Sequence, residues 1–133
     1  MTRKEAREQA FILVFEKNFS NESIADILDM AKETRDFTED DDGYVVKAFT
    51  GVFDNIEEVD GIISDNLTSG WTIGRISKVS LAVLRLAIFE MKYMEEIPVA
   101  VSIDEAVELC KKYSVADDAS FVNGVLGTVA KGL

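Results

Sequence analysis

The sequence predicts an all-α protein of about seven helices. Apolar residues recur at spacings of three and four along most of the chain, and no convincing strand pattern interrupts them. The 133 residues include one Pro and eight Gly, and 47% of them are apolar. A chain of this size and composition is expected to form one globular domain with a buried core.

The first helix is predicted over about residues 3 to 17. Its apolar positions follow the spacing of one helix face: Ala6, Ala10, Leu13 and Val14. A second helix, capped by Ser20 or Asn21, runs to about Lys32. Its predicted buried face consists of Ile24, Ile27, Leu28 and Ala31.

The acidic stretch 36–42 breaks this periodicity and predicts a solvated loop. Within it, Thr38 followed by Asp41 resembles the capping arrangement of a helix N-terminus. Third and fourth helices follow, separated at Asp54-Asn55 or by a kink near Gly61. Their apolar positions are Val45, Val46, Phe49, Val52, Phe53, Ile56, Val59, Ile62, Ile63 and Leu67.

A connector follows, marked by the turn signal Ser69-Gly70 and by Gly74. Trp71 lies in this connector and is predicted to plug the core. The next helix, over residues 79–94, is apolar almost all round and must therefore be central. Arg85 interrupts its apolar surface and is predicted to pair with a carboxylate.

Two further helices complete the predicted fold. The first begins at an S-x-x-E capping box formed by Ser102 and Glu105 and ends near Tyr113. The second is capped by Asp117 or Asp118. Its apolar face consists of Phe121, Val122, Val125, Leu126 and Val129.

The composition argues against an enzyme. There is no His, which removes the commonest general base and metal ligand, and no glycine-rich phosphate-binding motif is present. The single cysteine, Cys110, cannot form an intrachain disulfide and falls on an apolar helix face. We expect neither a catalytic residue, nor a metal site, nor a cofactor. The remaining enzymatic alternative is a carboxylate-dependent metal enzyme.

The chain shows no sign of membrane insertion. Its longest stretch without a charged residue, Ala119 to Ala130, is shorter than the roughly 20 residues needed to span a bilayer. The N-terminal apolar run lacks the cleavage pattern of a secretory signal. We therefore expect a cytoplasmic protein that does not contact membranes.

The charge is unevenly distributed along the chain. The chain has 25 Asp and Glu and 14 Lys and Arg, which gives a formal net charge of −11. Any phosphate binding must therefore occur at a local cluster of cations. Arg3, Lys4 and Arg7 form a basic spot, and residues 66–89 contain Lys78 among other cations but no acid. These four cations are predicted RNA contacts. The alternative is that the N-terminal cations merely solubilise a helix.

Six blocks, taken in order, carry a family resemblance. They are Gly70-Trp71 with Arg75, Val83-Leu84-Arg85-Leu86-Ala87-Ile88-Phe89-Glu90, Pro98-Val99-Ala100-Val101, Asp104-Glu105-Ala106-Val107-Glu108-Leu109, and Phe121-Val122-Asn123-Gly124-Val125-Leu126, together with the N-terminal Arg7, Ala10 and Val14. The series ending in F-V-N-G-V-L is the specific part. The chain thereby resembles the NusB transcription antitermination factors over most of its length.

The resemblance implies a non-enzymatic role and two packed helical subdomains, over about residues 1–67 and 68–133. NusB-like proteins pair with NusE, a protein of the small ribosomal subunit. The pair binds the boxA element of ribosomal RNA leaders and helps RNA polymerase to read through terminators. Carried across by motif, the RNA-binding residues are Arg3, Lys4, Arg7, Asp118 and Phe121, and the partner-facing positions are Phe15 and Ser80.

Elementary chemistry supports part of this assignment. The Phe121 ring can stack on an unpaired base, and Asp118 can accept from a base edge or cap its helix. Two positions depart from the family pattern, because Ser120 replaces a basic residue and Ser80 an acidic one. These departures and the acidic charge leave one alternative open. It is a helical interaction module or homodimer with weak or no RNA binding.

Overall fold

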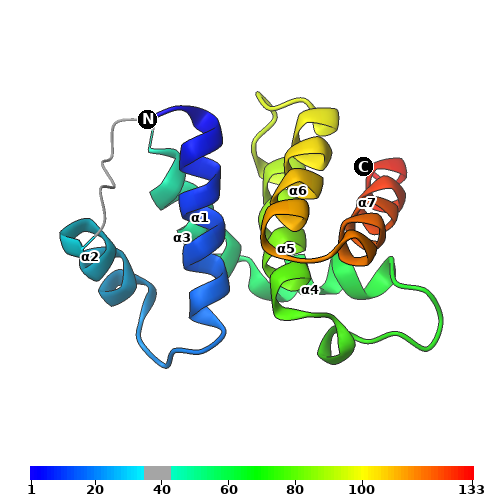
Figure 1. Cartoon of the computed structure of the whole chain (residues 1–133), viewed down its shortest axis with the longest axis horizontal. Coiled ribbons are helices and arrows are strands. Elements are labelled where there is room, and N and C mark those ends of the chain that lie inside the picture. Colours follow the sequence, from blue (N-terminus) through cyan, green and yellow to red (C-terminus); the bar gives the residue numbers. More distant parts are fainter. Residues whose placement is uncertain (35–42) are drawn as a thin grey trace.

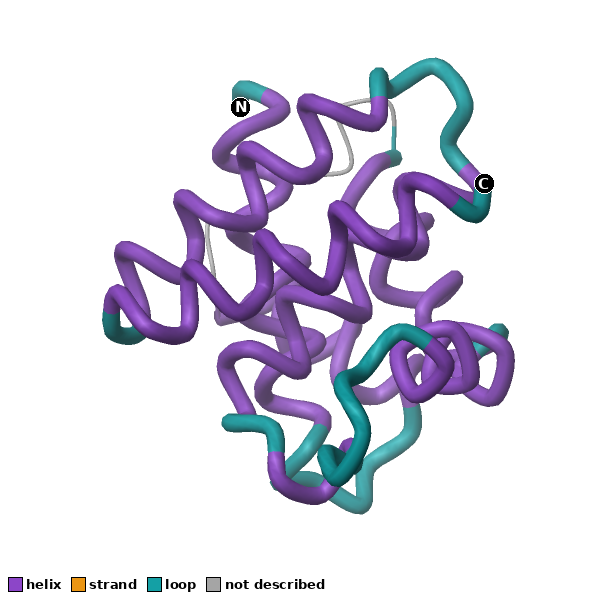
Figure 2. Tube along the Cα trace, turned by 90° about the vertical axis from the view of Figure 1, so that its right-hand side faces the viewer, coloured by secondary structure: helices purple, strands orange, loops and turns teal. Residues whose placement is uncertain are grey.

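The computed structural model describes residues 1–34 and 43–133 and confirms the all-α prediction. No strand occurs in these two ranges, as Figure 2 shows. The helices are α1 (Arg3–Lys17), α2 (Ile24–Thr34), α3 (Tyr44–Asp54), α4 (Ile56–Asp65), η1 (Ile73–Arg75), α5 (Lys78–Tyr93), α6 (Val99–Tyr113) and α7 (Ala116–Lys131). Thr38 and Asp41 fall outside the described residues, so their predicted cap is not placed.

Helix α5 is the centre of the fold, as its almost uniformly apolar sequence predicted. It packs against α1, α3, α4, α6 and α7, while α2 lies outside α1 and α3 (Figure 1). One hydrophobic core draws residues from all seven α-helices. Helix α4 contacts both α3 and α5, so the division into subdomains near residue 67 stays a prediction.

Several helices begin at other residues than the sequence predicted. Helix α2 begins after Ser23, whose hydroxyl accepts from the Asp26 amide, and so later than a cap at Ser20 or Asn21 would place it. Ser102 does not cap α6: the helix begins after Pro98, and Ser102 lies buried inside it. The first backbone amides of a helix have no acceptor within the helix. Proline has no backbone N–H to leave unsatisfied, so α6 can begin directly after Pro98.

The start of α7 also differs from the predicted one. Val115 occupies the N-cap position, and neither Asp117 nor Asp118 caps the helix; both lie in its first turn. A carboxylate in the first turn still stabilises a helix through the helix dipole. The break between α3 and α4 falls at Asn55, one of the two predicted places, and Gly61 lies inside α4.

A buried polar cluster joins four helices. Arg7 of α1 donates two hydrogen bonds to the Glu90 carboxylate of α5, from Nε at 2.7 Å and from Nη2 at 3.2 Å. The same carboxylate accepts from the Tyr44 hydroxyl of α3 and, at 2.8 Å, from the Ser102 hydroxyl of α6. Arg7 is 5% exposed and Glu90 1%. A buried charge pair is tolerated only when hydrogen bonds satisfy its polar atoms, as they do here.

A second ion pair joins α5 to α4. Arg85 forms a two-pronged interaction with Asp60, with both N–O distances 2.9 Å, and also donates to the Asn18 side chain at 3.1 Å. The prediction that Arg85 pairs with a carboxylate is confirmed. Asn18 closes the end of α1, so this contact positions α1, α4 and α5 together.

We expect Glu90→Gln to lower the free energy of unfolding by about 3–5 kcal/mol, because it leaves the Arg7 charge buried without its counter-charge. Urea denaturation followed by circular dichroism measures the effect. Glu108→Gln is the matched control, since it removes an exposed carboxylate that lies 3.6 Å from Lys111. A loss for Glu90→Gln no larger than for this control would contradict the structural role of the cluster.

We expect Gly51→Ala to destabilise the protein, although alanine is the better helix former by about 1 kcal/mol. A Cβ atom at Gly51 would overlap Cζ of Phe89, whose ring is buried where α3 packs against α5. Overpacking of this kind costs typically about 1–3 kcal/mol. Gly61→Ala in α4 is the control, because nothing lies within 4 Å of its added Cβ. Thermal denaturation should show the two variants shifting in opposite directions.

Candidate nucleic-acid interface

The predicted RNA contacts lie in two separate groups. The N-terminal group consists of Arg3, Lys4 and Arg7 at the start of α1; the second group lies around the start of α5 and α7. Arg7 contacts Glu90, whereas Lys78 is the first residue of α5. Residues 78 and 90 are separated by about 18 Å along a helix axis at 1.5 Å per residue. A ligand touching both groups must therefore be extended.

Within the N-terminal group, the three cations are used differently. Lys4 has the most accessible side chain, 68% exposed, and pairs with Glu105 at 3.1 Å. The Arg3 guanidinium lies over the Tyr44 ring, 4.8 Å from its centroid. Arg7 is held in the core by Glu90, so its guanidinium is not offered to a ligand in this structure. The sequence placed Arg7 in a compact basic spot on the surface, and this placement is corrected because the side chain is buried. A part for Arg7 in RNA binding stays a prediction.

Electrostatics around the buried cluster favours a charged Arg7. Burial alone would lower the pKa of its guanidinium, but the hydrogen bond and charge of Glu90 outweigh this and raise it. Burial, together with the facing Glu90 carboxylate, raises the pKa of Tyr44 well above its usual value. Tyr44 therefore stays protonated and donates to the carboxylate over the whole physiological range.

The second group is built around an aromatic pair, Trp71 and Phe121. Their ring centroids are 5.9 Å apart, and Phe121 comes from the first half of α7. Trp71 is 48% exposed, so its predicted role as a core plug is wrong. Gly70, with a left-handed φ of +90°, forms the turn before Trp71, whereas Ile73 and Ile76 further along the connector pack on or in the core.

Two cations, Arg75 and Lys78, follow Trp71 along the chain. The Arg75 guanidinium carbon lies 5.5 Å from the Trp71 ring centroid, a cation–π distance, and its Nη1 donates to the Gly70 carbonyl at 3.2 Å. Lys78 is exposed at the start of α5, one residue after the cap Ser77. An exposed ring beside a cation suits single-stranded nucleic acid, because a base can stack on the ring and a phosphate can contact the cation.

Asp118 connects the elements beneath the aromatic pair. Its carboxylate accepts from the Ser77 hydroxyl at 3.1 Å and from the Ser114 hydroxyl. It thus ties the start of α5 to the connection between α6 and α7, instead of capping its own helix as predicted. One consequence is to fix Lys78 and Phe121 relative to each other.

Cys110 lies in the core beneath the same region. Burial and the nearby Asp118 charge raise the pKa of its thiol to about 11, against a smaller opposing effect of Ser80. The Cys110 side chain is fully buried, and a thiol that stays protonated is a poor nucleophile. The prediction that Cys110 serves as a small core residue is confirmed.

The two predicted partner-facing positions differ in accessibility. Ser80 is 1% exposed and lies in the core, so it offers no surface to a partner. Phe15 is half-buried in an aromatic row that continues to Phe19 on one side and Phe11 on the other, with centroid distances of 5.2 and 6.2 Å. Tyr113 of α6 extends the row from Phe11 at 5.0 Å. Phe19 is 66% exposed, which leaves an apolar edge open.

Sequence reasoning missed the exposure of Trp71 and the contribution of Arg75 to its surroundings. The signal was present, because a tryptophan between a glycine turn and polar residues has no apolar periodicity to bury it. Among the described residues no cluster of three or more acidic, Cys or His side chains could hold a metal ion. In the same residues, no helix is long and apolar enough to cross a bilayer.

The comparisons with known proteins agree with one another. The model of the NusB family matches residues 4–131. The transcription antitermination protein NusB of Acetivibrio thermocellus is 44% identical over 131 residues, covering 98% of this chain and 90% of the relative. The NusB protein of Clostridium novyi is 41% identical over 133 residues, covering 98% and 99%.

Solved structures show the same likeness in three dimensions. T. maritima NusB superposes with a TM-score of 0.87 at 34% identity, over 98% of this chain and 92% of that one. A structure of antitermination factors NusB and NusE in complex with dsRNA also gives a TM-score of 0.87, at 28% identity over 98% and 97%. Fold, length and sequence therefore agree, and the chain belongs to the NusB family of transcription antitermination proteins.

Proposed function

We propose that this chain binds single-stranded boxA-type RNA of ribosomal RNA leaders together with a NusE-type ribosomal protein. In this role it joins the RNA polymerase elongation complex in the cytoplasm and promotes read-through of terminators. The observation that carries the RNA proposal is the contact of the exposed Trp71 ring with the half-buried Phe121 ring, with Arg75 over Trp71 and the exposed Lys78 at the start of α5. No catalytic step is part of this function.

The aromatic pair favours single-stranded over double-stranded RNA. Bases in a duplex are stacked on one another and cannot lie on a protein ring, whereas unpaired bases can. One structural relative was solved with dsRNA, so the two forms need a direct comparison. Lys4 and Arg3 are proposed as further phosphate contacts on an extended strand, and Arg7 as the residue that positions them.

The partner is proposed to cover the aromatic row on α1 and α6. Phe15 and Phe19 present apolar surface there, and exposed aromatic side chains are typical anchors of protein interfaces. A basic ribosomal protein suits a chain whose net charge is −11, and it would add positive charge that this chain lacks for RNA. Ser80 has no direct place in this interface, because it is buried.

An interaction module or homodimer without RNA binding remains the second reading. The aromatic row supports it, because its exposed Phe19 edge fits any apolar partner surface, including a second copy. Size-exclusion chromatography with light scattering, run with and without the NusE-type partner, separates the proposed function from a persistent homodimer. Under the proposed function the chain alone elutes as a monomer, or as a dimer that the partner dissociates.

The decisive experiment is fluorescence anisotropy of a labelled boxA-like RNA, with the chain alone and with the NusE-type partner, at two salt concentrations. We expect tight binding only with the partner, weakening as salt rises. Each lost phosphate contact should lower the salt slope by about 0.7 for single-stranded RNA, so Lys78→Ala and the pair Arg3→Ala/Lys4→Ala should flatten it. Lys131→Ala, an exposed cation at the far end of α7, is the control. Unchanged slopes in both test variants would contradict the phosphate contacts.

The aromatic pair has its own optical test, because Trp71 is the single tryptophan of the chain. We expect single-stranded RNA to quench its fluorescence, and duplex RNA of the same sequence to do so much less. Loss of one stacked base costs about 1–3 kcal/mol, so Trp71→Ala and Phe121→Ala should each weaken binding roughly fivefold or more. Tyr93→Ala removes an exposed aromatic ring at the end of α5, outside the proposed RNA and partner surfaces, and should leave RNA quenching unchanged. Full-strength binding by Trp71→Ala would overturn the assignment.

A further inference from the structure

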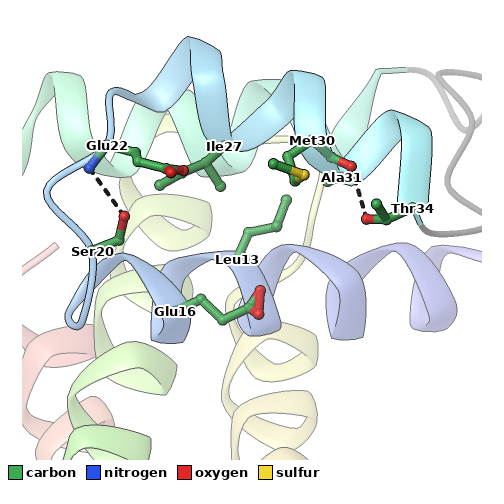
Figure 3. A pocket seen from close by; sticks show the side chains of 8 residues that line it. All are labelled: Leu13, Glu16, Ser20, Glu22, Ile27, Met30, Ala31 and Thr34. Carbon is green, nitrogen blue, oxygen red and sulfur yellow. Dashed lines mark hydrogen bonds between the residues drawn. The ribbon is translucent and has the colours of Figure 1, made fainter.

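A groove of about 190 Å³ lies between α1 and α2, away from both RNA groups. Figure 3 shows Leu13 pointing from α1 toward Ile27 and Met30 of α2, which form the opposite wall. Leu13 and Ile27 are buried, whereas Met30 is 54% exposed. The groove therefore has an apolar floor with one flexible, accessible side chain at its mouth.

Acidic side chains surround the groove. Glu16 and Glu22 line it directly, and the adjoining hollow on α2 is lined by Glu22, Asp26, Asp29, Met30 and Glu33. Asp26, Asp29, Met30 and Glu33 are spaced three or four residues apart and therefore share one face of α2. Within the described chain, no Lys or Arg forms an ion pair with Glu22, Asp26, Asp29 or Glu33.

This face is unfavourable for α2 on its own. Like charges three and four residues apart, such as Asp26 with Asp29 and Asp29 with Glu33, destabilise a helix. The apolar side chain of Met30 is exposed to water beside these acids, which is unfavourable. It is flexible and can adapt its shape to a bound apolar group. Both features become favourable when a cationic, apolar ligand covers the groove.

We propose that the α1–α2 groove docks a basic amphipathic helix from a protein partner. One apolar side chain of that helix enters between Leu13 and Met30, and its Lys and Arg side chains meet the acidic face of α2. Helices that lay an apolar face into a hydrophobic groove are a recurrent mode of recognition. The sign of the charge selects this occupant, because RNA, an anionic membrane and a second copy of this chain with its charge of −11 are all repelled.

The groove shares no lining residue with the aromatic pair, the N-terminal group or the aromatic row. The inference is thus independent of the proposed RNA binding. It adds a second protein-binding surface on the N-terminal side of the molecule, where α2 lies outermost in Figure 1. A bound RNA and a docked basic helix could then be held at the same time.

The test uses a labelled peptide of about twelve residues with Leu at helical spacing and Lys or Arg elsewhere, titrated into the full chain. We expect saturable binding in fluorescence anisotropy and changes in the methyl NMR signals of Leu13, Ile27 and Met30. Asp29→Lys/Glu33→Lys should weaken binding by about tenfold or more, since it reverses the charge that attracts the peptide. Met30→Ser leaves all charges in place and should weaken it several-fold.

The matched control is Glu95→Lys/Glu96→Lys, which makes the same change in net charge in the exposed connection between α5 and α6. Its peptide affinity should stay close to that of the parent. Equal losses in the two charge-reversal variants, or equal binding of a peptide with every Leu replaced by Ser, would overturn the proposal in favour of diffuse attraction. Self-association that Asp29→Lys/Glu33→Lys weakens would overturn it in favour of a second copy. RNA anisotropy of each variant, expected to be unchanged, keeps this outcome separate from the RNA proposal.

Discussion

The arrangement of the helices depends on one buried interaction, the ion pair between Arg7 and Glu90. Its polar atoms are satisfied by groups from α1, α3, α5 and α6, so these four helices must meet at one place and in one register. An apolar core tolerates sliding of helices past one another far better than a buried charge pair does. We infer that the cluster contributes to specifying this packing more than to its net stability.

The same interaction changes how the surface charge can be used. Because Arg7 is taken into the core, the basic spot at the start of α1 keeps Arg3 and Lys4 on its outer side, and both have contacts of their own. A chain with few accessible cations and a charge of −11 has little electrostatic attraction for RNA. Under the proposed function, stacking on Trp71 and Phe121 is therefore the larger contribution of this chain to RNA binding, and a basic partner supplies the positive charge.

The structure also separates three surfaces that differ in their chemistry. The aromatic pair with Arg75 and Lys78 suits unpaired bases, the aromatic row with Phe15 and Phe19 suits an apolar protein surface, and the α1–α2 groove suits a basic helix. Each is formed by the ends or outer faces of helices whose inner faces pack on or around α5. A small helical protein can in this way hold several partners around one rigid core.

The sequence by itself determined the number and type of the elements, the central position of α5 and the fact that Arg85 pairs with a carboxylate. These follow from apolar spacing and from the cost of burying a lone charge, which are properties of a few neighbouring residues. Helix starts were less determined, because Ser102 and Asp118 carry cap-forming side chains that tertiary contacts with Glu90, Ser77 and Ser114 use instead. Only the tertiary structure decided that Arg7 and Ser80 are buried, that Trp71 is exposed beside Phe121, and that Leu13 and Met30 form a groove. Burial of a side chain depends on which distant segments pack over it. The apolar periodicity of a single helix does not predict those tertiary contacts.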